Sequence, residues 1–316
     1  MKTLGSPRRS LDPVPSLKSL HPAAAQWIGT LIRIASPHPA MTKILDIIER
    51  LSDRPYRTNF LLVGEPGTGK EGLGRALAHL TCPDGPLVRF DVAGFPEEEA
   101  LELLCGTPRR AGIAEAADGG VIFIDELAGL GPRVQAVLLR LVKSGRCERR
   151  GGGRGGSEYD TDTEDTAANR RTKRFEVHVI AASDRNLVAE VEGGRLRHDL
   201  FHRLARVVLW LPPLRERVED IGAAAIWMGN RILRAAGYPL EVLGGEEFQR
   251  ATEAERARAL TFDDEALRRL EGHPWPGNFR ELESVLERAL LLYRQDATIG
   301  ASEIAAALNA PGPLSS

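Results

Sequence analysis

The first segment whose residue types and spacing could do chemistry is Gly64-Glu65-Pro66-Gly67-Thr68-Gly69-Lys70. It has the pattern of a phosphate-binding loop, G-x-x-x-x-G-K, and it lies between an apolar run and a helical pattern. Glycines in such a loop let backbone N–H groups turn toward phosphate oxygens, and the helix N-terminus adds a partial positive charge. Lys70 would then reach the β- and γ-phosphates of a nucleotide. This segment therefore predicts a nucleoside triphosphate site.

Paired carboxylates follow a second apolar run, in Gly119-Gly120-Val121-Ile122-Phe123-Ile124-Asp125-Glu126. A strand that ends there places Asp125 and Glu126 at the same edge of a parallel sheet as the phosphate loop. Asp125 would hold Mg²⁺ through its water shell, and Glu126 would polarise the attacking water. Glu71 stands where phosphate loops usually carry Ser or Thr, so it is a second candidate oxygen for the metal. The pattern predicts an ATPase that uses ATP and Mg²⁺.

Five short apolar runs would position these groups, and each is continuous rather than alternating. Continuous runs are typical of strands buried on both faces of a parallel sheet, and helical patterns separate most of them here. We therefore expect an α/β fold with a five-stranded parallel sheet. Beyond Pro213 only helical patterns continue, which predicts a small all-helical lid domain. The five runs are 60–63, 87–92, 121–125, 177–182 and 207–211.

The domain organisation follows from these patterns and from changes in composition. Residues 1–33, rich in proline and polar residues, are expected to be a flexible leader. We assign 34–213 to the nucleotide-binding domain, 214–309 to the lid and 310–316 to a tail. Residues 149–174 combine glycines with blocks of opposite charge, so we expect a mobile insert there.

Composition excludes several classes of protein. The chain has 316 residues, and 42 Lys and Arg against 44 Asp and Glu give a net charge of -2, so no overall field favours nucleic acid or a membrane surface. No segment is apolar enough for a membrane span or a signal peptide. The three cysteines are too few and too scattered for a disulfide framework or a zinc site. We expect a cytoplasmic protein in a reducing environment.

The longer motifs resemble one family. GEPGTGKE, GGVIFIDEL, RLRHDLFHRLARVVLWLPPLRERVEDI and WPGNFRELESVLERALLL are similar to the central AAA+ domain of bacterial enhancer-binding proteins, the ATPases that activate sigma-54 RNA polymerase. The resemblance extends over about residues 34 to 308. It implies self-association into a ring, commonly a hexamer, with ATP at the subunit interfaces. It also implies a five-stranded parallel sheet followed by a helical lid.

The resemblance also assigns roles to individual residues. Arg197 and Arg203 align with arginines that reach a neighbouring subunit's ATP, and Arg280 aligns with the lid arginine that senses nucleotide. Asp184 falls where the family often has a polar residue that senses the γ-phosphate, commonly Asn. Asp91 replaces the family's Asn that restrains the catalytic glutamate, and an ionised carboxylate cannot donate that hydrogen bond.

The largest departure from the family lies between Leu104 and Gly119, where the loop string Gly-Ala-Phe-Thr-Gly-Ala that touches sigma-54 is absent. We expect no helix-turn-helix for DNA within this chain. Three interpretations therefore stay open. The chain is a transcriptional ATPase that acts on the RNA polymerase machinery, an ATP-driven remodeller of another partner, or a nucleotide-gated scaffold. If the contact loop is lost, we expect a partner to dock through the 149–174 insert.

Overall fold

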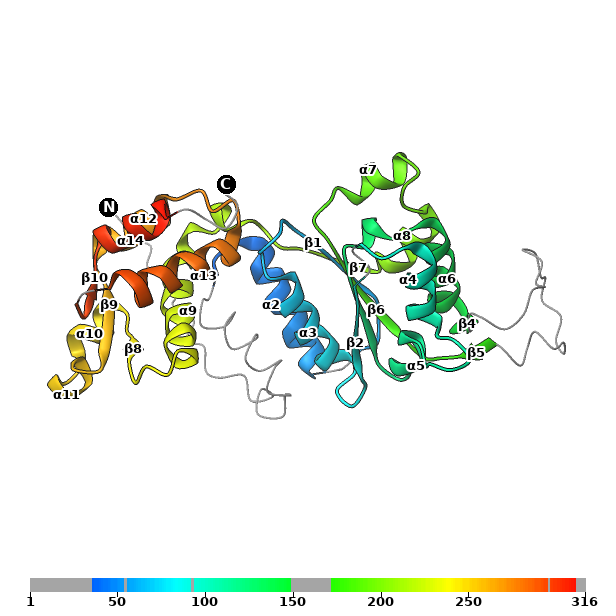
Figure 1. Ribbon diagram of the computed structural model, residues 1–316, viewed down its shortest axis with the longest axis horizontal. Coiled ribbons are helices and arrows are strands. Elements are labelled where there is room, and N and C mark those ends of the chain that lie inside the picture. The colour runs from blue at the N-terminus through cyan, green and yellow to red at the C-terminus, as the bar shows by residue number, and fades with distance from the viewer. Residues whose placement is uncertain (1–35, 54–55, 92–93, 149–171, 295, 311–316) are drawn as a thin grey trace, which may run out of the picture.

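The computed structural model of the chain describes residues 36–53, 56–91, 94–148, 172–294 and 296–310. Figure 1 shows an α/β unit, which contains the main sheet, beside a smaller unit that contains α9 to α14. The expected leader at 1–33, most of the expected insert and nearly all of the expected tail lie outside the described residues. The predictions for those segments stay predictions.

The main sheet has five strands in the order β2-β3-β6-β1-β7, and every neighbouring pair is parallel. The predicted five-stranded parallel sheet is therefore confirmed, and each strand begins and ends within one residue of an apolar run. The strands are β1 (Phe60–Val63), β2 (Leu87–Asp91), β3 (Val121–Asp125), β6 (His178–Ser183) and β7 (Val207–Trp210).

Helices cover both faces of this sheet, which is why its strands are continuously apolar (Figure 1). Leu61 packs into the core on one face, together with residues from α4, α6 and α8. Its neighbours Phe60 and Leu62 pack on the other face against α2 and α3. Alternate side chains of one strand thus enter two separate cores. The helices are α2 (Pro39–Asp53), α3 (Lys70–Thr81), α4 (Glu97–Cys105), α5 (Ile113–Ala116), α6 (Pro132–Ser144), α7 (Leu187–Glu192) and α8 (His198–Leu204).

Two cysteines correct the expectation drawn from their number and spacing. Cys105, at the end of α4, forms a disulfide with Cys147 in β4 (Arg146–Glu148), while Cys82 is free and buried. Their positions are 42 apart in sequence. Because α4 packs on α6 and α6 leads into β4, the fold brings them together, which spacing alone could not reveal. The cysteines therefore no longer support a reducing compartment.

Strand β5 (Thr172–Arg174) pairs antiparallel with β4, so the last three residues assigned to the insert belong to a two-stranded ladder.

The segment from Cys105 to Gly119 is fully described and compact. A bridge between Thr107 and Arg110 closes a tight turn, and Ala114 in α5 is fully buried.

The lid is not wholly helical, which corrects another expectation. Three short parallel strands form a sheet beside its helices, in the order β10-β9-β8. They escaped detection because they have two to four residues, too few to show a period. The lid strands are β8 (Glu241–Val242), β9 (Ala259–Phe262) and β10 (Thr298–Ile299).

The predicted lid helices are present, and two short helices join them. The helices are α9 (Ile221–Ala235), α10 (Gly245–Arg250), α11 (Glu253–Arg256), α12 (Asp264–Gly272), α13 (Asn278–Arg288) and α14 (Ala301–Asn309). Short 3₁₀ turns at Leu127–Gly129, Leu214–Glu216 and Val218–Asp220, and a π-helical turn at Ala289–Tyr293, complete the described secondary structure. Trp275, fully buried, centres the lid core and donates its indole N–H to the Leu270 carbonyl at 2.7 Å.

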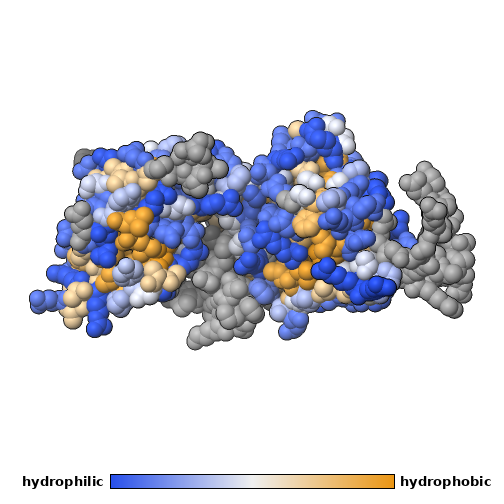
Figure 2. All heavy atoms as spheres, in the orientation of Figure 1, coloured by the Kyte–Doolittle hydropathy of each residue, from blue (hydrophilic) through white to orange (hydrophobic). Residues whose placement is uncertain are grey.

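Hydrophilic residues cover most of the face seen in Figure 2, and apolar residues gather in one patch on each unit. Within the described ranges, no helix combines the length and the apolar character needed to cross a membrane.

Candidate functional site

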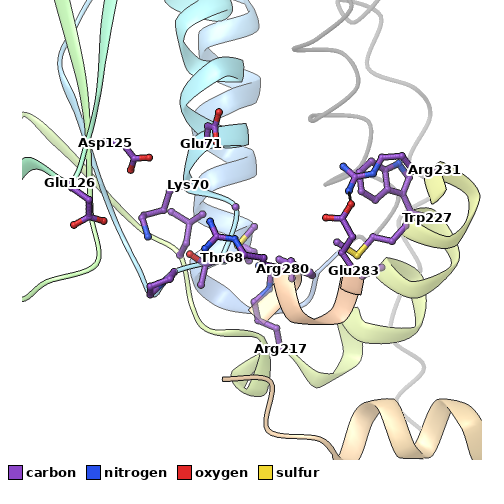
Figure 3. Close-up of a pocket in the computed structure, with 18 residues that line it drawn as sticks. Thr68, Lys70, Glu71, Asp125, Glu126, Arg217, Trp227, Arg231, Arg280 and Glu283 are labelled. Carbon is purple, nitrogen blue, oxygen red and sulfur yellow. Dashed lines mark hydrogen bonds and ion pairs between the residues drawn. The ribbon is translucent and has the colours of Figure 1, made fainter. Parts of the chain in front are cut away.

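A cavity of about 600 Å³ lies where the phosphate loop faces the lid (Figure 3). In the figure, Lys70, Asp125 and Glu126 point in from the α/β unit, while Trp227, Arg231 and Glu283 come from the lid. The cavity therefore joins a charged end and a partly apolar end. Its lining residues are Met41, Pro66, Gly67, Thr68, Gly69, Lys70, Glu71, Asp125, Glu126, Leu211, Arg217, Ala224, Trp227, Met228, Phe279, Arg231, Arg280 and Glu283.

The phosphate loop has the geometry that its glycines predict. Gly67 and Gly69 have φ angles of 79° and 100°, which L side chains rarely adopt. A Cβ on Gly67 would also lie 2.3 Å from the Gly277 carbonyl oxygen in the lid. Lys70 opens α3 and donates from Nζ to the carbonyl oxygens of Gly64 and Glu65, at 2.6 and 2.9 Å. This buried ammonium is therefore held at the point where phosphate would lie.

Electrostatics around Lys70 favour an anionic ligand. Burial lowers the pKa of Lys70, and the neighbouring carboxylates, Asp184 first, oppose that shift. A phosphate group in the cavity would give this partly desolvated cation a further counter-charge.

The lid is bonded directly to the phosphate loop. The guanidinium of Arg215 holds the Glu65 carboxylate through two hydrogen bonds, at 2.8 and 2.6 Å. Together with Asn278, this pairing lowers the pKa of Glu65 to about 2. Asn278, fully buried, donates to the Pro66 carbonyl at 3.0 Å and accepts from the Leu214 N–H at 2.7 Å. Side-chain hydrogen bonds therefore join the lid to the phosphate loop.

Three carboxylates meet Lys70 at the end of the strands. Asp125 ends β3 and Glu126 follows it, while Asp184 follows β6 and shares a hydrogen bond with Glu126. Burial, and then the charge of Asp184, raise the pKa of Glu126. Glu126 also has a left-handed φ of 58°, an unusual conformation for a non-glycine residue. A carboxylate whose pKa lies above its usual range can accept a proton more readily, as a general base requires.

Asp125 and Glu71, the two residues proposed to bind the metal, are bridged by one arginine. Arg89 on β2 donates to Asp125 at 3.0 Å and to Glu71 at 3.1 Å. It also forms an ion pair with Asp91 at 3.5 Å. Within the described ranges, no group of three or more acidic, His or Cys side chains could hold a metal by itself. Two carboxylates with phosphate oxygens and water nevertheless suit Mg²⁺.

Residues of the lid, of α2 and of the end of β7 line the partly apolar end of the cavity. Phe279 lies below the Arg217 guanidinium, with 5.2 Å from Cζ to the ring centroid. Arg231 lies over the Trp227 ring and forms an ion pair with Glu283. Arg217 donates to Asp220 at 2.6 Å, and its Nη2 has no partner among the described residues. A planar base would find apolar faces and donors at this end.

Arg197 and Arg203 do not line the cavity of their own chain. The Arg197 side chain is 47% exposed and pairs with Asp199 at 3.0 Å. Arg203, on α8, forms no ion pair in the part of the chain that the structure describes. Both positions agree with a role outside the chain's own site.

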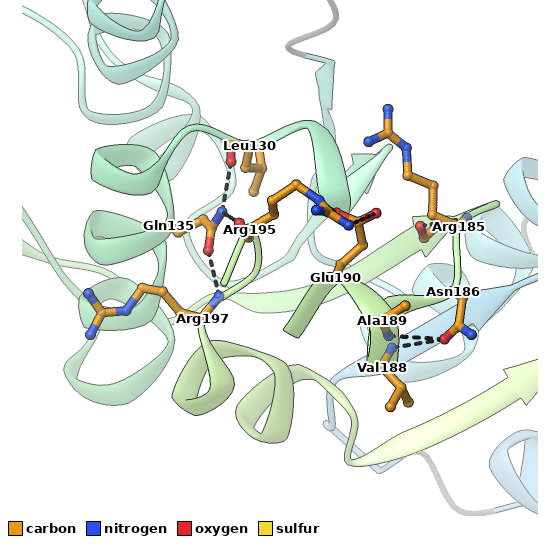
Figure 4. Close-up of polar contacts among 10 residues, drawn as sticks. Leu130, Gln135, Arg185, Asn186, Val188, Ala189, Glu190, Arg195 and Arg197 are labelled. Carbon is orange, nitrogen blue, oxygen red and sulfur yellow. Dashed lines mark hydrogen bonds and ion pairs between the residues drawn. The ribbon is translucent and has the colours of Figure 1, made fainter. Parts of the chain in front are cut away.

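A buried glutamine fixes the backbone that carries Arg197 (Figure 4). Gln135 on α6 accepts from the Arg197 N–H at 2.9 Å and donates to the carbonyls of Leu130 and Arg195, at 2.7 and 2.8 Å. Nearby, Asn186 caps α7 by accepting from the N–H groups of Val188 and Ala189 (Figure 4). The arginine-bearing segment is thus anchored, while the Arg197 side chain projects outward.

Most of the predicted site residues therefore come together, and several contributors were not foreseen. Of the predicted set, Gly64, Glu65 and Asp184 lie beside the cavity rather than in its lining, and Arg197 and Arg203 lie elsewhere. Sequence reasoning missed Arg89, Arg215 and Asn278. The last two stand in the motifs LPPLRERVEDI and WPGNFRELE, whose unusual polar residues were the available signal.

Comparisons with known proteins agree with this geometry. A family model described as the sigma-54 interaction domain matches residues 34–210, and a model of the AAA+ ATPase lid domain matches residues 245–314. The crystal structure of NtrX from Brucella abortus in complex with ATP is similar, with a TM-score of 0.65 and 27% identity. The similarity covers 83% of this chain and 53% of that one.

Curated relatives are bacterial regulators. The Nif-specific regulatory protein of Azotobacter vinelandii is 35% identical over 272 residues, which are 83% of this chain and 44% of that protein. The transcriptional regulatory protein XylR of Pseudomonas putida is 34% identical over 278 residues, 84% of this chain and 42% of that protein. The chain spans less than half the length of these relatives.

Proposed function

We propose that this chain, which belongs to the sigma-54 interaction domain family, binds ATP with Mg²⁺ in the cavity between the phosphate loop and the lid and hydrolyses it. The observation that carries this proposal is the convergence of Lys70, Asp125 and Glu126 on one cavity that the lid closes. In the cell, such an ATPase would serve transcriptional regulation in the cytoplasm.

Each residue has a distinct part in the proposed reaction. Lys70 and the loop N–H groups bind the β- and γ-phosphates, and Arg280 contacts them from the lid. Asp125 and Glu71 would hold Mg²⁺ together with phosphate oxygens, and the bound metal would offset the negative charge of the phosphates. Glu126 takes a proton from the attacking water, and its raised pKa suits this task.

The site is completed by a second copy of the chain in this proposal. Arg197 and Arg203 lie outside their own cavity and would reach the γ-phosphate of a neighbour's ATP, where guanidinium groups stabilise developing charge. Their outward placement supports self-association into a ring, which we take to be a hexamer as in the family.

Two substitutions test the assignment of the ATPase site. Lys70→Ala should abolish ATP binding, while Glu126→Gln should bind ATP and lose turnover, because only the water-activating group is changed. Lys43→Ala, which removes an exposed lysine on α2, is the matched control and should behave as wild type. Binding is measured with a fluorescent ATP analogue, and turnover by phosphate release. Equal ATP affinity in the wild type and Lys70→Ala would refute the proposed site.

A second candidate function rests on one observation. The segment from Cys105 to Gly119 folds into a tight turn and the short helix α5, in which Ala114 is buried, and this differs from the contact loop of the family. This compact segment favours an ATP-driven remodeller, or a nucleotide-gated scaffold, that acts on a protein other than the RNA polymerase machinery.

A further inference from the structure

Arg89 lies at the centre of an ion-pair cluster on the metal side of the cavity. Its guanidinium donates through Nη2 to Asp125 Oδ2 and through Nη1 to Glu71 Oε1, at 3.0 and 3.1 Å. It also pairs with Asp91 at 3.5 Å. The cluster links three elements, because Arg89 and Asp91 come from β2, Asp125 from β3 and Glu71 from α3.

This arrangement places a cation where the proposed function requires a metal. The oxygens that Arg89 engages belong to the two side chains expected to face Mg²⁺. A guanidinium bound to both occupies one oxygen of each and offsets their charge. Mg²⁺ therefore has to compete for these oxygens, or Arg89 has to move aside.

We propose that Arg89 is the resident counter-ion of the metal-binding carboxylates and that it competes with divalent cations for Asp125 and Glu71. The inference rests on the proposed function, since it concerns the metal of the same site. Arg89 acts as a positioning residue in this scheme. It keeps the two carboxylates together before the metal arrives, and it sets how much Mg²⁺ the site needs.

The chain offers a close control for this effect. Arg75 pairs with the same carboxylate, Glu71, at 2.6 Å, but no contact joins it to Asp125. Both arginines are about half exposed, at 56% for the Arg75 side chain and 45% for the Arg89 side chain. Removing either one takes one positive charge from the surroundings of Glu71. Only the loss of Arg89 also frees Asp125.

The experiment measures Mn²⁺ binding by electron paramagnetic resonance in the full chain with ADP bound. The wild type, Arg89→Ala, Arg89→Lys and Arg75→Ala are compared. Arg89→Ala should bind Mn²⁺ roughly two to five times more tightly than the wild type, because an ion pair at a partly exposed site changes an equilibrium by up to about that factor. Arg75→Ala should stay within about twofold. Arg89→Lys keeps the positive charge but lacks the planar guanidinium that can bond two carboxylates at once. Its Mn²⁺ affinity should lie between those of the wild type and Arg89→Ala.

The outcomes separate this inference from the proposed function. ADP affinity is measured first in EDTA, without metal, and circular dichroism checks that each variant is folded. If the wild type binds no ADP, the proposed function fails. If all variants bind ADP but Arg89→Ala holds Mn²⁺ no more tightly than the wild type, the proposed function stands and the role of Arg89 is rejected. An equal gain in Mn²⁺ affinity in Arg75→Ala would also overturn the role of Arg89, because the loss of any nearby positive charge would then explain the effect.

Discussion

Two carboxylates that share a hydrogen bond define the chemistry of this site at the residue scale. Glu126 and Asp184 come from different strands and meet near Lys70. Burial disfavours ionisation of Glu126, and the like charge of Asp184 adds to the effect. The aspartate at position 184 thus has a physical consequence that an asparagine would not have, because it raises the pKa of Glu126.

This pairing predicts the pH dependence of turnover. A general base must be ionised, so activity should fall as the pH drops through the raised pKa of Glu126. Asp184→Asn removes the like charge and can donate a hydrogen bond, which should lower that pKa and move the acid limb toward lower pH. The measurement is the turnover number at saturating ATP and Mg²⁺ as a function of pH. Asp46→Asn, at an exposed position of α2, should leave the profile unchanged. An unshifted acid limb in Asp184→Asn would argue against Glu126 as the base.

At the element scale, the start of α13 connects the lid to the phosphate loop. Asn278 is fully buried with a left-handed φ of 51°, and its amide joins the loop at Pro66 to the chain at Leu214. The backbone adds a third contact, because the Phe279 N–H donates to the Gly67 carbonyl at 3.1 Å. This helix start therefore links the phosphate loop to the lid, and in the proposed function it is the route by which bound nucleotide would affect the lid.

Asn278→Ala should lower the free energy of unfolding by about 2–4 kcal/mol. Part of this cost is the loss of buried hydrogen bonds, and part is the left-handed backbone, which alanine disfavours. It should also weaken ADP binding, because the phosphate loop loses a support. Asn230→Ala is the control, since that side chain makes two hydrogen bonds to Val242 inside the lid. Asn230→Ala should lower the free energy of unfolding without changing the affinity for ADP. Equal ADP affinity in both variants would show that the lid contact does not support the loop.

The sequence predicted those elements whose signal is local. The five strands of the main sheet are apolar on both faces, so their runs are visible without any knowledge of the fold. The phosphate loop and the carboxylates at the end of β3 were likewise found, since their chemistry depends on adjacent residues. The short lid strands were missed because two to four residues carry no period.

The missed site residues share a different cause. Arg89 acts through Glu71 and Asp125, which lie 18 and 36 positions away in the sequence. Arg215 reaches Glu65 across 150 positions. Such residues can be recognised as neighbours only when the sheet order and the position of the lid are known. The disulfide between Cys105 and Cys147 escaped prediction for the same reason.

At the scale of the whole molecule, the segment from Cys105 to Gly119 bears on which partner the proposed ATPase would act on. Its turn is short, and buried Ala114 anchors α5 directly after it, unlike a long loop that could deliver motion to sigma-54. We therefore expect this chain alone, with ATP, to form no open complexes on a sigma-54 promoter in an in-vitro transcription assay. Lys70→Ala provides the background level. Open complexes above that background would show that the compact segment does not prevent activation.

Assembly is the second question at this scale. Arg197 is held by Gln135 with its side chain directed outward, and neither Arg197 nor Arg203 reaches the cavity of its own chain. In the proposed function, a complete site therefore needs residues from two subunits. The specific activity should consequently rise with protein concentration.

The most direct test of this account is a mixture of two inactive variants. Arg203→Ala retains an intact nucleotide cavity, and Lys70→Ala retains the arginines that would serve a neighbour. Each alone should hydrolyse almost no ATP, and the mixture should recover part of the wild-type turnover, because one subunit supplies the cavity and the other the arginine. A mixture that stays inactive although the two variants associate, or a wild-type monomer whose specific activity is the same at every concentration, would contradict the account.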